Sequence, residues 1–272
     1  MKQEQDSHTS AIPDKGAPSE QVAPQTPVAP LPQSAQSAKP VAAKKPAKNL
    51  YEPYVTPPVL YHTIRYVALA LLNIIVRLRV RGLYNVPKQG AFIISSNHLS
   101  WTDIPFIPLY LRRKVVYMAK EEYYTSKLAW LVRFLGAFPV KRGEGDRQAL
   151  RAGEEQLKKG NILTIFPEGT RSRSRKMAKA HAGMGMIALR SGVPVVPVAI
   201  WGSEKTFKKF RPQVTISYGE PMVLKPKGKK VTRGDINEAT EQVMRKIAEM
   251  LPPEYRGAYS EELPAPGTEE GI

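Results

Sequence analysis

The chain contains no cysteine among its 272 residues. Disulfide bonds, thiolate metal sites and a cysteine nucleophile are therefore excluded. The chain also lacks a Cys-x-x-Cys pair, a His-Glu-x-x-His motif and a phosphate-binding loop of the Walker type, so it implies no metal, nucleotide or other cofactor. Any catalysis by this chain would rest on oxygen and nitrogen side chains.

Aromatic side chains are absent from the first 50 residues, which are rich in Pro, Ala, Gln, Ser and Lys. Such a segment buries too little apolar surface to offset its ordering entropy, so we expect residues 1–48 to be a disordered tail. The segment also has no apolar run of the kind that a secretory signal needs. Residues 252–272 are rich in Pro, Gly and Glu, and we expect a flexible acidic tail there. About 200 residues remain, enough for one domain.

Negative charge is scarce, and the net charge of the chain is +17. Residues 1–50 carry six lysines against four acids, and residues 252–272 carry one arginine against five acids. The central residues 51–251 therefore hold a net charge of +19. A surplus of this size indicates an anionic partner, which could be nucleic acid, anionic lipid or a phosphorylated substrate.

A nucleic-acid partner would need aromatic stacking platforms interleaved with the cations. The basic clusters at 173–179, 205–211 and 225–233 contain only Phe207 and Phe210 as aromatic residues. We therefore expect no nucleic-acid partner, and we favour a lipid surface and a phosphorylated substrate.

A long, clean hydrophobic run is also missing. Residues 57–80 are the most hydrophobic stretch, but its uninterrupted part is only 11 residues, 66–76, and includes Asn73. A spanning helix needs about 20 apolar residues. We therefore expect residues 49–82 to form an amphiphilic helical segment in the membrane interface; a buried core helix and a single span are the alternatives. The flanking cations, which we expect to reach lipid headgroups, are Arg65, Arg77, Arg79 and Arg81.

Beyond residue 82, short apolar runs alternate with helix-like stretches. This alternation predicts an α/β fold with a central, largely parallel sheet flanked by helices. The run 193–200 is apolar on both faces, as in a central strand, but its two prolines predict that the strand is an edge, bulged or distorted there. The predicted strands are 91–95, 114–118, a short one within 136–143 that ends in two cations, 161–166, 193–200 and 213–218, and the predicted helices are about 102–111, 121–135, 145–159, 181–191 and 232–250.

Histidine is scarce, with four in the chain, and one of them has informative neighbours. His98 follows the apolar run 91–95, and Asp103 comes five positions later. In one cleft, the carboxylate could hold one imidazole nitrogen as N–H and leave the other to accept a proton. Ser100 and Asp103 also match a capping box, which predicts a helix start near Trp101. The plain alternative is that Asp103 only caps this helix.

A second motif, Phe-Pro-Glu-Gly-Thr-Arg-Ser at 166–172, follows another apolar run. Pro167 stops the strand, and Gly169 permits a tight turn. Thr170 and Arg171 would then face the carboxyl end of the strand, where open α/β sheets bind ligands. Because arginine suits bidentate contact with phosphate, the motif indicates a phosphate site.

These motifs resemble those of the glycerolipid acyltransferases that acylate lysophosphatidate, the 1-acylglycerol-3-phosphate O-acyltransferases. The likeness runs over about residues 57–225. The Asn-His-x-x-x-x-Asp motif of that family is met in full at 97–103, and its Phe-Pro-Glu-Gly-Thr-Arg-Ser motif is matched letter for letter at 166–172. The usual Gly-x-x-Phe-Ile-x-Arg keeps only Gly136 and Arg142. The usual Phe-Lys-x-Gly reads Ala-His-Ala-Gly, with His181 in the place of the lysine.

The resemblance implies acyl transfer from a thioester to the free hydroxyl of 1-acyl-glycerol-3-phosphate, which gives phosphatidic acid. His98 would take the hydroxyl proton, and Asp103 would fix its tautomer and steady the imidazolium, with no covalent enzyme intermediate. Ser100 is an alternative nucleophile that is better explained as a helix cap. Residues implied to bind the substrate are Glu168, Gly169, Thr170, Arg171, Arg142 and Lys120.

The resemblance also implies acyl-CoA or acyl carrier protein as the donor and a phospholipid membrane as a partner. Residues 83–251 would form the catalytic domain, associated with the cytoplasmic face of a membrane. Within the same enzyme class the acceptor could be another lysophospholipid, a lyso-amino-lipid or glycerol 3-phosphate. The alternative from another class is a non-catalytic membrane-surface scaffold, which would predict a broken first motif.

Overall fold

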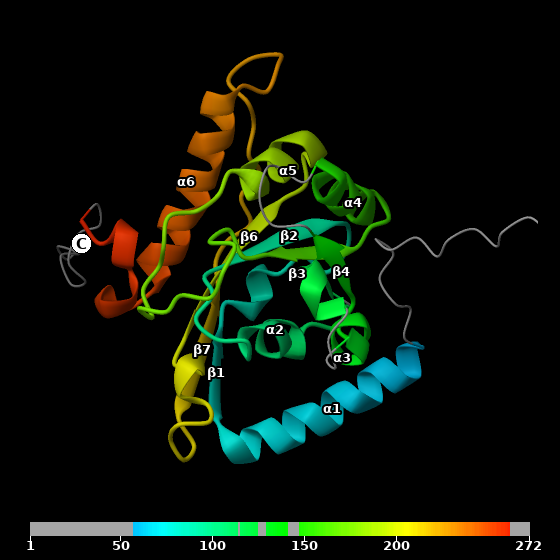
Figure 1. Cartoon of the computed structure of the whole chain (residues 1–272), viewed down its shortest axis with the longest axis vertical. Helices are drawn as coiled ribbons and strands as arrows, with labels where there is room; N and C mark the ends of the chain where they lie inside the picture. Colours follow the sequence, from blue (N-terminus) through cyan, green and yellow to red (C-terminus); the bar gives the residue numbers. More distant parts are fainter. Residues whose placement is uncertain (1–56, 114, 125–128, 141–146, 262–272) are drawn as a thin grey trace, which may run out of the picture. The chain divides into compact units, whose positions relative to one another are not determined.

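The computed structural model describes residues 57–113, 115–124, 129–140 and 147–261 (Figure 1). The predicted disordered tail, residues 1–48, lies outside this part of the chain. The helices are α1 (Pro58–Ile75), α2 (Asp103–Phe106), α3 (Ala129–Phe134), α4 (Arg147–Lys158), α5 (Gly183–Ser191) and α6 (Arg233–Met250), and the 3-10 turns are η1 (Leu83–Asn85), η2 (Ile107–Tyr110), η3 (Glu121–Tyr124), η4 (Ser203–Lys205), η5 (Pro253–Tyr255) and η6 (Gly257–Tyr259).

Seven strands form one sheet in the order β1-β7-β6-β2-β5-β3-β4. Five neighbouring strands, from β6 to β4, run parallel, whereas β7 pairs antiparallel with β6 and β1 pairs parallel with β7. The prediction of an α/β fold with a central, largely parallel sheet is therefore confirmed. The strands are β1 (Arg77–Arg81), β2 (Phe92–Ser96), β3 (Val115–Lys120), β4 (Ala137–Val140), β5 (Ile162–Ile165), β6 (Val195–Trp201) and β7 (Gln213–Tyr218).

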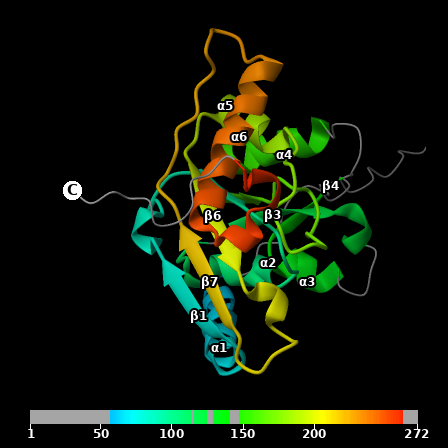
Figure 2. The same cartoon turned by 90° about the vertical axis from the view of Figure 1, so that its left-hand side faces the viewer.

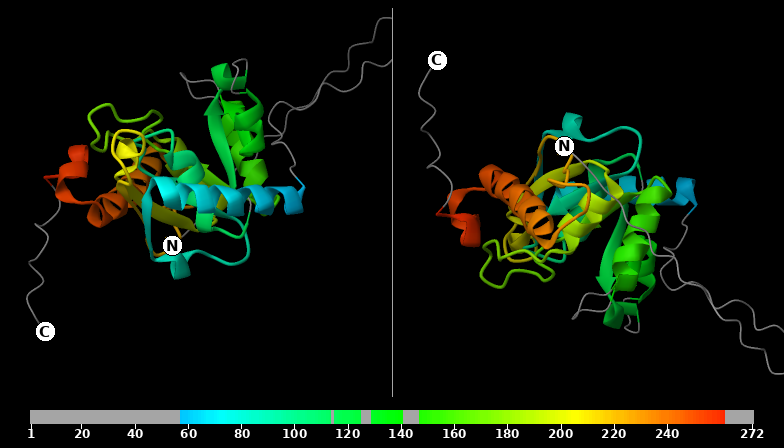
Figure 3. Two further views of the ribbon diagram at one scale, coloured as in Figure 1. Left: turned by 90° about the horizontal axis from the view of Figure 1, so that it is seen from below. Right: turned by 90° about the horizontal axis from the view of Figure 1, so that it is seen from above.

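Helices cover both faces of the sheet because its central strands are apolar on both faces. In β2, Ile93 packs into a core shared with α4, α5 and α6. The neighbouring Phe92 and Ile94 pack into a second core, shared with α2 and η2. Figure 1 shows α4 and α5 on one side of the sheet and α2 and α3 on the other, and Figure 3 shows the same arrangement from below and above.

Strand β6 lies in the middle of the sheet, so the edge-strand alternative is wrong, but the predicted bulge is present, because the pairing with the chain after β7 shifts by one residue opposite Pro197. Val195 and Met222 exchange two backbone hydrogen bonds of 2.8 Å. The backbone nitrogen of Pro197, two residues on, therefore points toward the same neighbouring segment as the N–H of Val195. The ladder to β7 begins only at Val198, opposite Tyr218. Two residues of β6, Val196 and Pro197, therefore face the three residues 219–221, and Gly219 donates its N–H to the Pro197 carbonyl oxygen at 2.8 Å.

The apolar stretch 57–80 is not one helix. Helix α1 ends at Ile75, and β1 follows at once as the edge strand beside β7. Arg65 is also not available to a lipid headgroup, because its guanidinium donates to the carbonyl oxygen of Leu111 at 2.7 Å. No helix in the described part of the chain is long and apolar enough to cross a membrane.

The first part of the predicted flexible acidic tail, up to residue 261, is packed against the domain. The rings of Tyr255 and Tyr259 are buried. Met177 donates its backbone N–H to Tyr255, and its own carbonyl accepts from Ala258. Gly257 has φ +53°, and a Cβ there would lie 2.2 Å from the Met177 carbonyl oxygen. The composition of 252–272 indicated a flexible tail because Pro, Gly and Glu dominate it, whereas only two tyrosines anchor it. Residues 262–272 lie outside the described part.

Candidate active site

The two sequence motifs meet at one edge of the sheet. Because β2, β5, β3 and β4 are parallel, their carboxyl ends share that edge. The segment 97–103 leaves β2 there, and the segment 166–172 leaves the adjacent strand β5. This is the edge at which open α/β sheets bind ligands.

His98 and Asp103 form a buried pair. The imidazole Nδ1 lies 2.8 Å from Asp103 Oδ2. The same oxygen accepts the backbone N–H groups of Leu99 at 2.7 Å and Ser100 at 2.8 Å. A carboxylate held by three donors accepts rather than donates, so Nδ1 carries the proton and Nε2 is left as the acceptor. No other group in the described part of the chain bonds Nε2.

Asp103 therefore combines both roles that the sequence left open. Its carboxylate accepts from the Ser100 N–H, as in a capping box, and it holds His98. The reciprocal half of the box is missing, because the Ser100 hydroxyl accepts from the Thr102 N–H at 3.3 Å. Helix α2 consequently begins at Asp103, two residues later than predicted.

His98 is also clamped from the second motif. Its ring stacks on Phe166 with centroids 4.0 Å apart and an angle of 18° between the planes. Its backbone N–H donates to Glu168 Oε1 at 3.0 Å, and its carbonyl oxygen accepts from the Ser172 N–H at 2.8 Å. His98 is thus held by three contacts to the second motif, residues 166–172.

Asn97 was not singled out by its chemistry, although it stands first in the motif. Its side-chain amide donates to the Ile200 carbonyl oxygen at 2.8 Å, and its Oδ1 accepts from the Ile200 N–H at 2.9 Å. This pair of bonds continues the ladder between β2 and β6 past the last strand residue. Asn97 therefore sets the point from which the segment carrying His98 departs.

Glu168 is buried and orients two loops, because each of its carboxylate oxygens accepts a backbone N–H. Oε1 accepts from the His98 N–H, and Oε2 accepts from the Ala178 N–H at 3.0 Å. Burial raises the pKa of Glu168 to about 7, although the two N–H groups oppose that shift. The basic segment 173–179 is consequently tied down at its far end by Ala178.

Replacing Glu168 with glutamine is expected to lower the free energy of unfolding by about 1–3 kcal/mol, because the amide nitrogen cannot accept a hydrogen bond and one buried N–H loses its partner.

The raised pKa of Glu168 also makes the folded protein bind more protons than the unfolded chain between pH 4.5 and 7, so native stability falls with rising pH in that window. Glu168→Gln should remove this fall. Urea unfolding at several pH values measures both effects, and a change at the exposed Glu155, Glu155→Gln, serves as control; an unchanged pH profile in Glu168→Gln would contradict the assignment.

The turn of the second motif is tight. Gly169 donates its N–H to the Phe166 carbonyl oxygen at 2.9 Å and has φ +67°. A Cβ at Gly169 would lie 3.0 Å from the ring of His181, so this histidine stands over the turn rather than capping a helix by its side chain. Thr170 and Arg171 follow the turn with exposed side chains.

The two other predicted phosphate contacts are less defined. Lys120 ends β3 at the same edge as His98, opposite Val140 in β4. Its side chain and the whole of Arg142 lie outside the described part of the chain. Within that part, no cluster of three or more His, Asp or Glu side chains could hold a metal ion.

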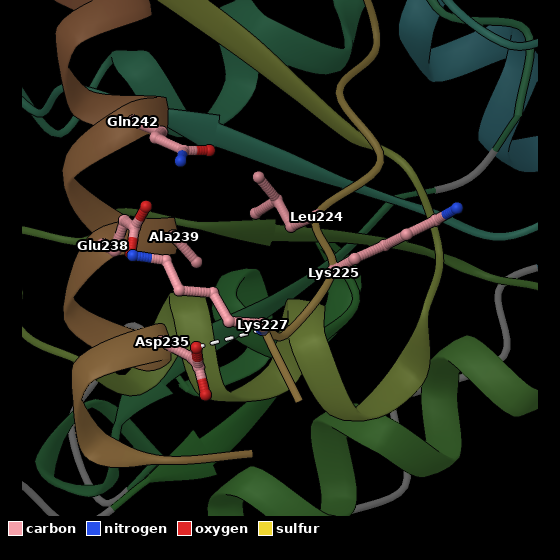
Figure 4. Close-up of a pocket in the computed structure, with 7 residues that line it drawn as sticks. All are labelled: Leu224, Lys225, Lys227, Asp235, Glu238, Ala239 and Gln242. Carbon is pink, nitrogen blue, oxygen red and sulfur yellow. Dashed lines mark hydrogen bonds and ion pairs between the residues drawn. The ribbon is translucent and has the colours of Figure 1, made fainter. Parts of the chain in front are cut away.

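A small hollow of about 30 Å³ lies at the opposite edge of the sheet (Figure 4). Asp235 lines it and forms a capping box with Thr232 at the start of α6. Asp235 also accepts the Lys227 N–H at 3.1 Å, and the Lys227 ammonium lies 2.7 Å from Glu238. These groups satisfy one another, so this hollow is a helix-capping feature.

A family model described as Acyltransferase matches residues 77–201. The chain is 33% identical over 162 residues to a 1-acyl-sn-glycerol-3-phosphate acyltransferase of Bacillus subtilis, which covers 56% of this chain and 78% of that protein. It is 36% identical over 124 residues to a lyso-ornithine lipid O-acyltransferase of Pseudomonas aeruginosa, which covers 45% and 46%. The crystal structure of the 1-acyl-sn-glycerophosphate (LPA) acyltransferase PlsC from Thermotoga maritima matches with a TM-score of 0.55 and 30% identity, over 70% of this chain and 80% of that one.

Proposed function

Because the chain belongs to the 1-acyl-sn-glycerol-3-phosphate acyltransferase family and is therefore an O-acyltransferase, we propose that it acylates the free hydroxyl of 1-acyl-glycerol-3-phosphate to give phosphatidic acid. The donor in this proposal is acyl-CoA or acyl carrier protein. One observation carries the proposal: His98, paired with Asp103, is hydrogen-bonded through both its backbone N–H and its carbonyl oxygen to the turn that bears Arg171.

In this mechanism His98 is the general base. Nε2 takes the proton of the acceptor hydroxyl as its oxygen attacks the thioester carbonyl carbon. Asp103 keeps the proton on Nδ1 and stabilises the imidazolium that forms. The tetrahedral intermediate then collapses, the C–S bond breaks, and the leaving thiolate takes the proton back from Nε2. No covalent enzyme intermediate is needed.

Arg171 is proposed to hold the acceptor phosphate, because it directly follows the Gly169 turn and is exposed at the active edge. Arg171→Ala should raise KM for lysophosphatidate by roughly 10–100-fold, the value of one charge-assisted hydrogen bond. The matched control is Arg173→Ala, two residues farther along, which should change KM by less than about threefold because single exposed cations contribute little. Initial rates over a range of acceptor concentrations measure this, and equal effects of the two changes would contradict the assignment.

Helix α1 is proposed to lie on the membrane. Most of its large apolar side chains are exposed, although only scattered apolar residues are usual on a soluble surface. An acceptor with one acyl chain stays in the bilayer, so the site must work at its surface, which we assign to the cytoplasmic face. The exposed side chains include Val59, Leu60, Val67, Leu71, Ile74 and Ile75.

The test is transfer of labelled oleoyl groups from oleoyl-CoA and from oleoyl-acyl carrier protein to lysophosphatidate in mixed micelles. Phosphatidate formed by the native chain, and lost in a variant without His98, supports the proposal and selects the donor. Activity that survives the loss of His98 would overturn the mechanism.

A second acceptor is favoured by a specific observation. The highest identity given above, 36%, is with a protein named for lyso-ornithine lipid. His181 also stands beside the turn, at the position where the acyltransferase motif usually has lysine. Lyso-ornithine lipid should therefore be assayed beside lysophosphatidate, and acylation of that lipid alone would replace the first proposal.

A further inference from the structure

The loop between β6 and β7 exposes two aromatic rings. Phe207 is 67% exposed and Phe210 is 92% exposed. Both belong to the sequence Lys-Thr-Phe-Lys-Lys-Phe-Arg at 205–211, which contains no acidic residue. Two phenylalanines this exposed bury little of their apolar surface within the domain, and the mechanism above does not use them.

The first residues of the loop are anchored by side-chain hydrogen bonds, whereas the residues that follow are exposed. Lys205 lies 3.3 Å from the Tyr255 hydroxyl, and that hydroxyl donates to Glu204 at 3.0 Å. The Thr206 hydroxyl donates to the Ser203 carbonyl oxygen at 2.7 Å. Beyond these anchors, residues 207–211 are all exposed.

The reversal of β7 brings this loop to the active edge. β6 ends at the same edge as β2, so the loop after Trp201 starts where His98 lies. β1 runs parallel to β7, so the end of α1 arrives at this edge too. The Arg211 guanidinium donates to the Asn73 carbonyl oxygen of α1 at 3.3 Å, and Figure 2 shows the loop and α1 at the same end of the β1–β7 pair.

One ring links the loop to the catalytic segment. Trp101, between His98 and Asp103 in the chain, is 52% exposed. Its ring stacks on Phe207 with centroids 6.0 Å apart and an angle of 16° between the planes, within the usual range for aromatic pairs. The entrance of the site is therefore bordered by an exposed aromatic pair.

We propose that residues 207–211 form a second membrane-docking element, which inserts Phe207 and Phe210 among the lipids while Lys208, Lys209 and Arg211 contact anionic headgroups. With α1 it would hold the entrance beside Trp101 against the bilayer. The proposal rests on a lipid-borne acceptor, as inferred above. A membrane fits better than an acidic protein, because the loop joins the exposed apolar face of α1 and its tip residues are aromatic.

The test compares Phe207→Ser/Phe210→Ser with the native chain in sedimentation with vesicles of phosphatidylcholine and phosphatidylglycerol. Loss of two inserted rings should weaken vesicle binding by about 10-fold or more. The matched control is Tyr84→Ser, because this ring is 89% exposed but follows β1 at the opposite edge of the sheet. That variant should bind like the native chain. Equal binding by all three proteins would overturn the proposal.

The charge of the loop is tested in the same way. Lys208→Glu/Lys209→Glu should lose binding to vesicles that contain phosphatidylglycerol and show little change on pure phosphatidylcholine. Lys229→Glu/Lys230→Glu, in an exposed loop at the opposite edge, provides the control with the same change of charge. A loss of binding as large in the control would show a general effect of net charge and would contradict a role of the loop.

Activity separates this proposal from the proposed function. The single Phe210→Ser variant, which leaves the Trp101–Phe207 pair intact, should keep its kcat on a short-chain lysophosphatidate dissolved as monomers and lose activity on lysophosphatidate embedded in vesicles. If the native chain acylates neither form, the proposed function fails, whereas vesicle binding still tests the loop. A loss confined to assays with acyl carrier protein, with vesicle binding intact, would overturn the proposal in favour of docking an acidic protein.

Discussion

Alanine in place of His98 is expected to lower kcat for acyl transfer by about 10²–10⁴-fold, which is the usual contribution of general acid–base catalysis. Within the described part of the chain, the His98 imidazole is the only basic side chain hydrogen-bonded to the buried carboxylate of Asp103. KM for the acceptor should change little, because Arg171 and the turn are not altered. Steady-state rates with labelled oleoyl thioester at saturating acceptor measure the loss.

Ser100→Ala is the matched control for that prediction. The Ser100 hydroxyl accepts from the backbone N–H and the hydroxyl of Thr102, just before α2, and the proposed mechanism gives it no step. Its loss should leave kcat within a few-fold of the native value. A loss for Ser100→Ala as large as that for His98→Ala would instead indicate a serine nucleophile and a covalent acyl-enzyme.

Replacing Asp103 with asparagine should cost about 10²–10⁴-fold in kcat, as the loss of the orienting carboxylate does in other histidine-based acyl transfer sites. The amide keeps one oxygen for the N–H groups of Leu99 and Ser100, so the segment can keep its course. However, the negative charge that stabilises the imidazolium is lost. The amide nitrogen would also take the place of Oδ1, a buried atom with no partner among the described residues.

Asp235→Asn is the control for Asp103→Asn. Asp235 is also a buried capping carboxylate with several donors, but it lies at the opposite edge of the sheet. Its replacement should lower the melting temperature and leave kcat unchanged. If both variants lost activity only in proportion to their loss of folded protein, Asp103 would be a structural residue.

Local sequence pattern was sufficient for most of the sheet. The six predicted strands are present with boundaries shifted by at most two residues at their starts. The apolar residues of each strand point to both faces, so short apolar runs identify them. The strand at Arg77–Arg81 escaped this reading, because its alternating arginines and apolar residues continued the apolar stretch of α1.

Contacts between distant segments could not be predicted from the sequence. His98 and Asp103 were found because their chemistry and spacing are visible within seven residues. The two bonds of Glu168, to residues 70 positions before and 10 after it, depend on how the strands are ordered. The packing of Tyr255 likewise depends on a partner, Met177, far away in the chain. In each case a tertiary contact, and no local propensity, decides the role of the side chain.

In the proposed mechanism, the two backbone bonds of His98 have a kinetic consequence. Its N–H and its carbonyl oxygen are both held by the segment that carries Arg171. An acceptor whose phosphate draws that segment into place would also align the base, whereas an acceptor without phosphate would leave the base less well aligned. Discrimination between lysolipids is then expressed in turnover as well as in affinity, and a poor substrate can occupy the site without being acylated.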